Sequence, residues 1–191
     1  MSAFPIASQA VYVASIKGDF QQVNALVAAG ANLNVFNGSG DTLLDYIVDS
    51  LAREPGPFNG DMLRLLLQLG ADPNILGDGD CSALTTAMLF MDSELLEILL
   101  SAGADPNRPC GFDEAETFYD WAEFDYRYNV WMRDNFEVDS INPPAEPSDA
   151  DHISEDSWLG YLDRVALNHG VRRPDHLFLL RKYGAKAAQE S

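Results

Sequence analysis

Residue types that could do catalytic or metal chemistry are spread along the 191-residue sequence rather than gathered in a known motif. The histidines His152, His169 and His176 form no His-Glu-x-x-His pair and lie near no cysteine. Two cysteines, Cys81 and Cys110, are too few for a disulfide framework or a structural zinc site. There is no Gly-x-Ser-x-Gly motif and no Gly-Lys-Ser/Thr phosphate loop. We therefore expect no enzyme, no cofactor and no metal site.

One acidic stretch, DPNILGDGD at residues 72–80, has carboxylates and a glycine, as a calcium-binding loop does. It lacks the glutamate that closes such a loop at its twelfth position. The stretch also falls on a turn of the repeat described below, so we expect a structural turn rather than a cation site. Carboxylates are abundant elsewhere, but abundance alone does not give a carboxyl group the raised pKa that acid catalysis needs.

The chain carries thirty acidic residues against twelve basic ones, a formal net charge of −18. Such a chain repels nucleic acid and anionic membranes, because both are bound through lysine and arginine. It attracts basic proteins at low salt, although the same charge would also serve solubility alone. No apolar run reaches about 18 residues, and no basic residue precedes the first apolar segment. We therefore expect a cytoplasmic protein without a membrane span or a secretory signal.

The elements that position these residues are repeated. Four segments end an apolar run with Gly and a small residue: LVAAGANLN (26–34), LLLQLGADPN (65–74), LLSAGADPN (99–107) and LLRKYGAKA (179–187). Their glycines, Gly30, Gly70, Gly103 and Gly184, are spaced by 40, 33 and 81 residues. A period of about 33 fits if the second unit holds seven extra residues and the fourth holds 48.

The third unit reads as a pair of helices. Ser82 is a candidate N-cap for the first helix, and a polar break follows at Asp92-Ser93. Residues 95–100 are almost entirely apolar and end at Gly103, which suits a helix C-terminus. A helix that is apolar on all sides must be buried between neighbours. The sequence therefore predicts an all-α chain of stacked helix pairs.

Three segments resemble the Thr-Pro-Leu-His-x-Ala signature that opens the first helix of an ankyrin repeat: TLLDYI (42–47), SALTTA (82–87) and TFYDWA (117–122). The first unit has only VYVA at 11–14, as a capping repeat would. The resemblance to the ankyrin repeat family covers about 140 residues. It implies one domain, 1–191, that is a solenoid of four helix-turn-helix units, with repeats at about 7–34, 38–74, 79–107 and 114–187.

The turns between units both follow and depart from this pattern. Residues 34–42, NVFNGSGDT, carry Gly38 and Gly40 where the chain bends back. In NILGDGDCS, residues 74–82, Asp80 stands where Gly is usual. The seven extra residues of the second unit, about 52–58, contain Pro-Gly-Pro, and we expect a tolerated surface loop there.

A longer insertion, about 127–171, interrupts the fourth unit. Residues 113–156 hold fourteen acids against two bases, two thirds of the net charge, interleaved with aromatic residues. We expect one long helix over 117–136, with Tyr119 and Tyr126 facing the stack. A helix over 155–170 would cover many of its other aromatic residues, unless a partner does. The acidic, Pro-rich segment 141–156 predicts a flexible loop or lid.

Ankyrin-type proteins bind other proteins through their turn tips and the exposed face of their first helices. The resemblance therefore implies a partner-binding surface formed by Phe36, Asn37, Asp41, Tyr46, Asp49, Leu76, Asp78, Asp80, Thr86, Phe90, Phe112, Glu114, Trp121, Asp125 and Tyr128. Phe36 and Leu76 could instead pack locally between turns. Small acidic chains of this kind resemble the immunity proteins that bacteria make against their own secreted toxins.

Two functions compete on these grounds. The first is an acidic inhibitor, monomeric when free, that neutralises one basic protein such as a toxin. The second is a general adaptor or regulator of protein-protein interaction. The charge concentrated in one insertion favours the inhibitor. A metal requirement would instead revive the idea of an enzyme.

Overall fold

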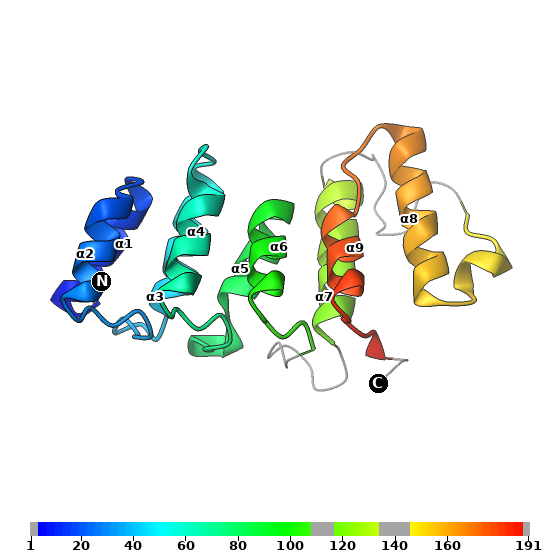
Figure 1. Cartoon of the computed structure of the whole chain (residues 1–191). Coiled ribbons are helices and arrows are strands. Elements are labelled where there is room, and N and C mark those ends of the chain that lie inside the picture. Colours follow the sequence, from blue (N-terminus) through cyan, green and yellow to red (C-terminus); the bar gives the residue numbers. More distant parts are fainter. Residues whose placement is uncertain (1–3, 108–116, 134–145, 189–191) are drawn as a thin grey trace. The chain divides into compact units, whose positions relative to one another are not determined.

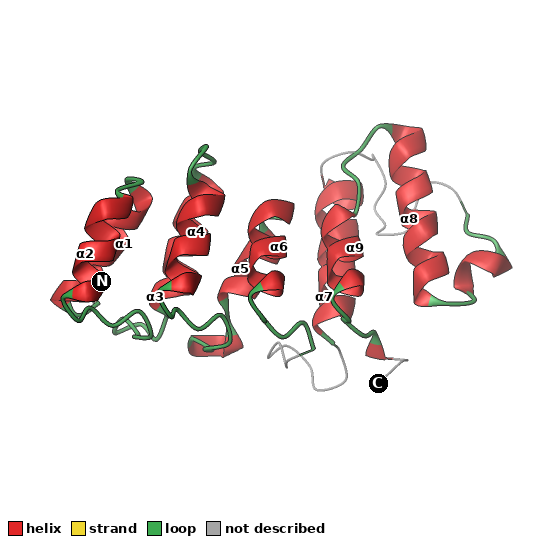
Figure 2. Ribbon diagram, in the orientation of Figure 1, coloured by secondary structure: helices red, strands yellow, loops and turns green. Residues whose placement is uncertain are grey.

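The computed structural model describes residues 4–107, 117–133 and 146–188 (Figure 1). Within these ranges the chain forms helices, turns and one isolated β-bridge, between Phe36 and Thr42, and no strands (Figure 2). The prediction of an all-α chain is therefore confirmed for the described residues. The elements are α1 (Ile6–Ile16), α2 (Phe20–Ala28), α3 (Leu43–Arg53), α4 (Asn59–Gln68), η1 (Asp78–Asp80), α5 (Ala83–Leu89), α6 (Ser93–Ser101), α7 (Phe118–Tyr126), η2 (Arg127–Arg133), η3 (Asp149–His152), α8 (Glu155–His169) and α9 (Asp175–Lys182).

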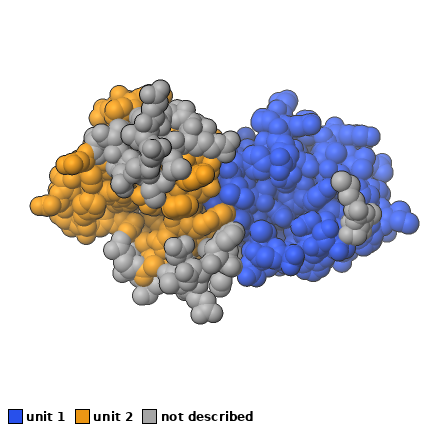
Figure 3. Space-filling model, turned by 180° about the vertical axis from the view of Figure 1, so that it is seen from behind, with its two compact units in different colours: residues 1–105, 109–112 blue, residues 106–108, 113–191 orange. Residues whose placement is uncertain are grey.

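The described residues form two compact units (Figure 3). Unit 1 contains the described residues up to Asp105, and unit 2 contains Pro106, Asn107 and the described residues from Thr117 onward. The prediction of a single domain over 1–191 stays a prediction.

Unit 1 consists of the helix pairs α1–α2, α3–α4 and α5–α6. The first helices pack side by side, since α3 contacts both α1 and α5, and α4 contacts α6 in the same way. The apolar residues of α6 between Leu95 and Leu100 are all buried, as the sequence predicted. Each fully buried leucine stabilises the fold by about 1.5–3 kcal/mol relative to an exposed one.

Side chains cap both helices of the third pair, and Ser82 does so as the sequence predicted. The Ser82 hydroxyl accepts a hydrogen bond from the Thr85 N–H and forms a capping box with Thr85 at the start of α5. The Asp92 carboxylate accepts from the N–H groups of Glu94 and Leu95 and caps α6. At the other end of α6, Gly103 takes a φ of 91°, a left-handed conformation that glycine adopts without strain.

Asparagine side chains bond the repeated endings to one another. The Asn34 amide donates to the carbonyl oxygen of Gly70 at 3.0 Å and accepts from the Asp72 N–H at 2.9 Å. In unit 2, Asn107 donates to Gly184 and accepts from the Lys186 N–H, both at 2.8 Å. The final asparagine of an ending thus satisfies a helix C-terminal carbonyl that would otherwise lack a partner.

The turns of unit 1 also contact one another at their tips. The Asp78 N–H donates to the Gly40 carbonyl oxygen at 3.0 Å. Gly40 has a φ of 88°, and Asp80 takes a φ of 57° in the next turn. Aspartate tolerates the left-handed region better than most residues do. The turn therefore keeps a left-handed backbone conformation at Asp80, although glycine is usual at this position.

Two predicted boundaries in the insertions are wrong. Helix α3 runs on to Arg53, so the loop of the second unit is residues 54–58 rather than 52–58. The predicted long helix is α-helical only over Phe118–Tyr126 and then widens into the π-helix η2, Arg127–Arg133. Residues 134–136 of that prediction lie outside the described residues.

The described part of the predicted flexible lid, from residue 146, is ordered by local bonds. The Ser148 N–H and hydroxyl both donate to Asp151 at the short helix η3, and Arg164 of α8 pairs with the same carboxylate. These bonds lower the pKa of Asp151 to about 2. Residues 141–145 lie outside the described residues. The predicted helix over 155–170 is confirmed as α8.

In unit 2, α7 contacts α9, and the two lie side by side in Figure 1. Both aromatic residues predicted to face inward, Tyr119 and Tyr126, are buried. The Tyr126 hydroxyl donates to the Arg172 carbonyl oxygen at 2.6 Å. The α8 residue Trp158 donates from its indole nitrogen to the Glu123 carboxylate of α7 at 2.8 Å. Helix α8 therefore covers part of α7, as predicted from the sequence.

Candidate functional site

Five carboxylates of unit 1 share one region, which we call the acidic face: Asp41, Asp45, Asp49, Asp78 and Asp80. Their proximity is visible in their mutual electrostatic effects. Burial raises the pKa of Asp45, and the negative charges of Asp41 and Asp49 raise it further. Burial also raises the pKa of the Cys81 thiol, to which Asp45, Asp41, Asp80 and Asp78 add. The face therefore gathers charge from α3 and from two successive turns.

Asp45 is the central residue of this face, and the sequence reasoning missed it. Its carboxylate accepts a hydrogen bond from the hydroxyl of Thr86, which joins α3 to α5. A sequence signal existed, because Asp45 and Asp49 are four residues apart and so share one side of a helix, and Asp41 lies just before that helix begins. Thr86 is a predicted partner-binding residue, but its hydroxyl already donates to this bond within unit 1.

The aromatic residues predicted to bind a partner beside the acidic face differ in their exposure to solvent. Phe36 at a turn tip and Tyr46 on α3 are exposed, and Tyr46 also packs against Phe4 and Tyr12. Phe90 is half-buried, with the Arg53 guanidinium 5.3 Å from the centre of its ring. Arg53 also pairs with the predicted residue Asp49 at 2.8 Å.

Two predicted tip residues serve the turns themselves. The Asn37 side chain accepts from the N–H groups of Ser39 and Asp41 and donates to the Asp41 carboxylate. Asn37 therefore holds its own turn together. Leu76 is half-buried, whereas Asp78 and Asp80 are exposed.

Unit 2 carries the other predicted residues on α7 and η2. Tyr128 is exposed and stacks on exposed Phe124, with ring centres 6.2 Å apart. Trp121 and Asp125 are half-buried. Burial raises the pKa of Asp125, which accepts a hydrogen bond from Asn129. Phe112 and Glu114 lie outside the described residues.

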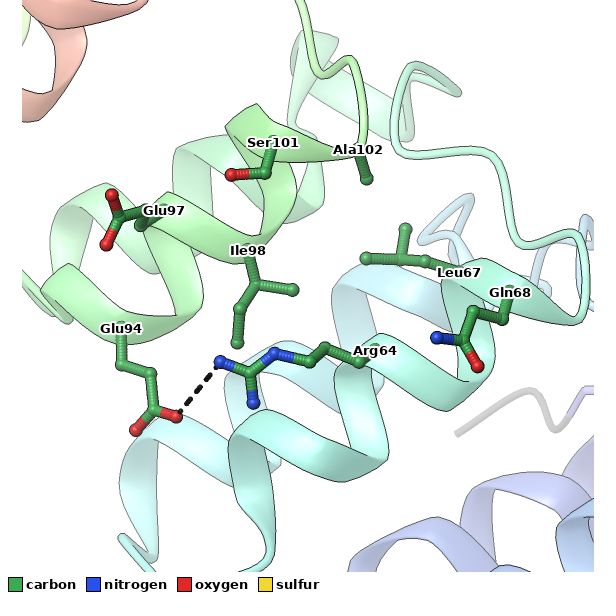
Figure 4. Close-up of a pocket in the computed structure, with 8 residues that line it drawn as sticks. All are labelled: Arg64, Leu67, Gln68, Glu94, Glu97, Ile98, Ser101 and Ala102. Carbon is green, nitrogen blue, oxygen red and sulfur yellow. Dashed lines mark ion pairs between the residues drawn. The ribbon is translucent and has the colours of Figure 1, made fainter.

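A groove of about 410 Å³ lies between the second helices α4 and α6 of unit 1 (Figure 4). Leu67 and Ile98 line it beside Arg64, which pairs with Glu94 at 3.6 Å and with Asp61 at 3.1 Å. The charges at this groove are thus partly matched within the chain. Among the described residues, Arg53 forms an ion pair with one carboxylate of the acidic face, Asp49.

Two described groups of types that often act in catalysis, Cys81 and His176, have pKa values shifted away from neutrality. The raised pKa keeps the Cys81 thiol protonated at neutral pH, so it is a poor nucleophile. Burial lowers the pKa of His176 to about 3, and this histidine is enclosed rather than open to a substrate. Across residues 4–107, 117–133 and 146–188, no group of three or more His, Cys, Asp or Glu side chains is arranged to hold a metal ion.

None of the helices in the described ranges has both the length and the apolar character needed to cross a bilayer. Comparison with known proteins finds no family model that matches the chain and no curated protein similar to it.

Proposed function

We propose that this chain is an ankyrin-type repeat protein that binds and neutralises one basic protein, such as a secreted bacterial toxin. The observation that carries the proposal is the acidic face, where five carboxylates from α3 and two turns share one region. The repeated helix pairs and asparagine bonds support an ankyrin-type stack, because such a stack presents successive turns along one surface.

Repulsion among these carboxylates gives the face its affinity for cations. The charges of Asp41 and Asp49 add to burial in raising the pKa of Asp45. The ionised carboxylates therefore repel one another while no positively charged group is bound to the face. A lysine or arginine from a partner would relieve that repulsion and return the pKa of Asp45 toward its ordinary value. Binding should therefore release protons when the pH is near the pKa of Asp45.

Exposed aromatic residues near the face supply the apolar contacts that a tight complex needs. Phe36 and Tyr46 keep much of their surface accessible, and buried aromatic anchors dominate the energy of many interfaces. Charge then brings the partner in quickly, while the aromatic contacts slow its departure. If the partner is a nuclease, the acids and aromatic residues of segment 113–156 would imitate phosphates and stacked bases.

The proposal is tested with a charge variant of the face. Asp49→Asn, Asp78→Asn and Asp80→Asn together remove three charges, and asparagine tolerates the left-handed φ of residue 80. The matched control, Asp61→Asn, Glu94→Gln and Glu97→Gln, removes three charges from α4 and α6. Each protein is used to capture partners from the lysate of the source organism at about 0.05 M and about 0.5 M salt, which changes the screening length severalfold.

We expect the wild-type and control proteins to capture the same single basic protein at low salt and to lose it at high salt. The face variant should fail to capture this protein at either salt concentration. Capture of many proteins would contradict the inhibitor and favour the adaptor. So would capture of one protein that changes neither with salt nor in the face variant. A captured enzyme that keeps full activity in the complex would show binding without neutralisation.

A further inference from the structure

The side chain of Arg53 already binds part of the acidic face. Its Nε and Nη2 atoms donate to the two carboxylate oxygens of Asp49, each at 2.8 Å. Its guanidinium carbon lies 5.3 Å from the centre of the ring of Phe90, the residue that follows α5. One guanidinium is therefore held by both oxygens of a carboxylate and by an aromatic ring.

These two contacts recognise an arginine in particular. A planar guanidinium matches both oxygens of a carboxylate at once, and it also stacks on aromatic faces. A lysine ammonium is a point charge and cannot form the paired hydrogen bonds. Asp49 lies on α3 and Phe90 at the end of α5, and these two helices pack against each other. The packing of the helix pairs thus sets the spacing of the carboxylate and the ring.

Arg53 can leave this position without disturbing the core. It is the last residue of α3, just before the loop 54–58, and its side chain is 64% exposed. An exposed ion pair between residues four apart on one helix stabilises a fold only slightly, because water solvates both charges in any case. When the Arg53 side chain turns outward, it uncovers the Asp49 carboxylate and one face of the Phe90 ring.

We propose that Asp49 and Phe90 form an arginine-binding subsite of the acidic face, in which Arg53 takes the position of an arginine from the basic partner. On binding, the partner's guanidinium pairs with both oxygens of Asp49 and lies over Phe90, while Arg53 turns into solvent. Asp45 lies near Asp49, so the subsite adjoins further negative charge. This inference rests on the proposed function, because it names the chemistry by which the same partner is recognised.

Arg53 then competes with the partner for the subsite. A site that is filled by its own side chain for part of the time binds its ligand more weakly in proportion. Arg53→Gln removes the competitor and should tighten the binding of an arginine ligand by at least about threefold. The matched control is Arg64→Gln, which makes the same charge change on α4, where Arg64 pairs with Asp61 and Glu94.

Two synthetic peptides of equal length serve as probes, so the test needs no captured partner. One alternates glycine with arginine, the other alternates glycine with lysine, and both have blocked ends. Nuclear magnetic resonance titration of the isotope-labelled full chain at about 0.05 M salt gives the dissociation constants. It also follows the Arg53 Nε–H signal, which should move toward that of an unbonded arginine as the arginine peptide binds.

We expect the arginine peptide to bind the wild-type chain at least about threefold more tightly than the lysine peptide does. Arg53→Gln should increase this preference, whereas Arg64→Gln should change the affinity for both peptides equally. Phe90→Leu keeps an apolar side chain but removes the ring, so it should abolish the preference while both peptides still bind. Asp49→Asn should abolish the preference too, and it serves if circular dichroism shows that Phe90→Leu perturbs folding.

Equal affinity of the wild-type chain for the two peptides would overturn the subsite, as would binding of neither peptide. Weaker binding of the arginine peptide to Arg53→Gln would also overturn it, because Arg53 would then contact the ligand itself. The capture experiment above depends on salt and on the face variant rather than on a choice between arginine and lysine. A failed subsite therefore leaves the proposed function standing, and a failed capture leaves the peptide result standing.

Discussion

The Asn74 side chain donates from Nδ2 to the carbonyl oxygen of Gly103 at 2.8 Å and accepts at Oδ1 from the Asp105 N–H at 2.9 Å. One amide thus satisfies both a carbonyl and an N–H of the following ending. Asn34 makes the same pair of bonds one ending earlier. The asparagine side chain carries a donor and an acceptor on one carbon, which suits the three endings that close on asparagine and are followed by another ending.

Replacing Asn74 with alanine should therefore lower the free energy of unfolding by about 1–2 kcal/mol, since two hydrogen bonds between neighbouring endings are lost. Urea denaturation followed by circular dichroism measures this change. Asn24→Ala is the matched control, because the exposed Asn24 side chain bonds only within α2, to the Phe20 carbonyl. Equal losses in the two variants would show that the bonds between endings contribute nothing beyond a local hydrogen bond.

The contact between turn tips can be isolated with two glycines of similar backbone. Gly40 and Gly70 have φ values of 88° and 98°, so alanine strains both positions alike. A Cβ at Gly40 would lie 2.9 Å from the Asp78 Cβ, whereas a Cβ at Gly70 meets nothing within 4 Å. We expect Gly40→Ala to cost at least about 1 kcal/mol more than Gly70→Ala, by the same urea measurement. Equal losses in the free energy of unfolding would mean that the contact between the turn tips does not stabilise the fold.

Local patterns predicted much of the fold. The helix pair of the third unit could be predicted because apolar spacing, the Ser82 cap and the polar break at Asp92-Ser93 act within a few residues. The asparagine bonds were not readable, since Asn34 and Gly70 are 36 residues apart and meet only after the helix pairs pack. The change from α-helix to the π-helix η2 left no visible mark in the sequence either.

The missed features of the candidate sites have separate causes. The acidic, Pro-rich composition of segment 141–156 predicts a flexible loop, whereas the Ser-x-x-Asp capping signal of Ser148 and Asp151 within it favours the short helix η3. Asp45 was missed because it occupies an ordinary position in the first turn of α3, after the Thr42 cap. Its pKa is raised first by burial and then by the charges of Asp41 and Asp49, and these effects arise only once the chain has folded.

The contact between α7 and α8 depends on Glu123. Its nearly buried carboxylate accepts from the Trp158 indole at 2.8 Å and from the Arg127 guanidinium at 2.9 Å. Glu123→Ala leaves both donors without this acceptor and should cost about 2–4 kcal/mol in urea denaturation. The tryptophan emission should shift to longer wavelength, and a Trp158→Phe background should remove that shift. Glu146→Ala changes an exposed carboxylate of unit 2 and should change stability by less than about 0.5 kcal/mol.

Burial of His176 gives unit 2 a specific response to acid. The imidazole is hydrogen-bonded to the backbone of Ala122 and packs against the Tyr126 ring. Burial, and to a lesser extent the positive charge of Arg172, lower the pKa of His176 from 6.5 to about 3. Between these pH values the unfolded chain binds a proton that the folded chain does not. The contribution of His176 to the free energy of unfolding should therefore fall as pH falls from 6.5 toward 3, by at most about 1.4 kcal/mol per pH unit.

The variant His176→Gln separates this response from the titration of the many carboxylates. Glutamine can still donate to the Ala122 carbonyl but takes up no proton, so the variant should lose less stability than the wild type between pH 6.5 and pH 4. Urea denaturation at several pH values gives the two curves, and their difference reports His176 alone, because the other groups are common to both proteins. His169→Gln removes an exposed histidine from α8 and is the matched control for a histidine-to-glutamine change outside the core of unit 2. If the curves of His176→Gln and the wild type were parallel instead, His176 would be open to protonation in the folded protein.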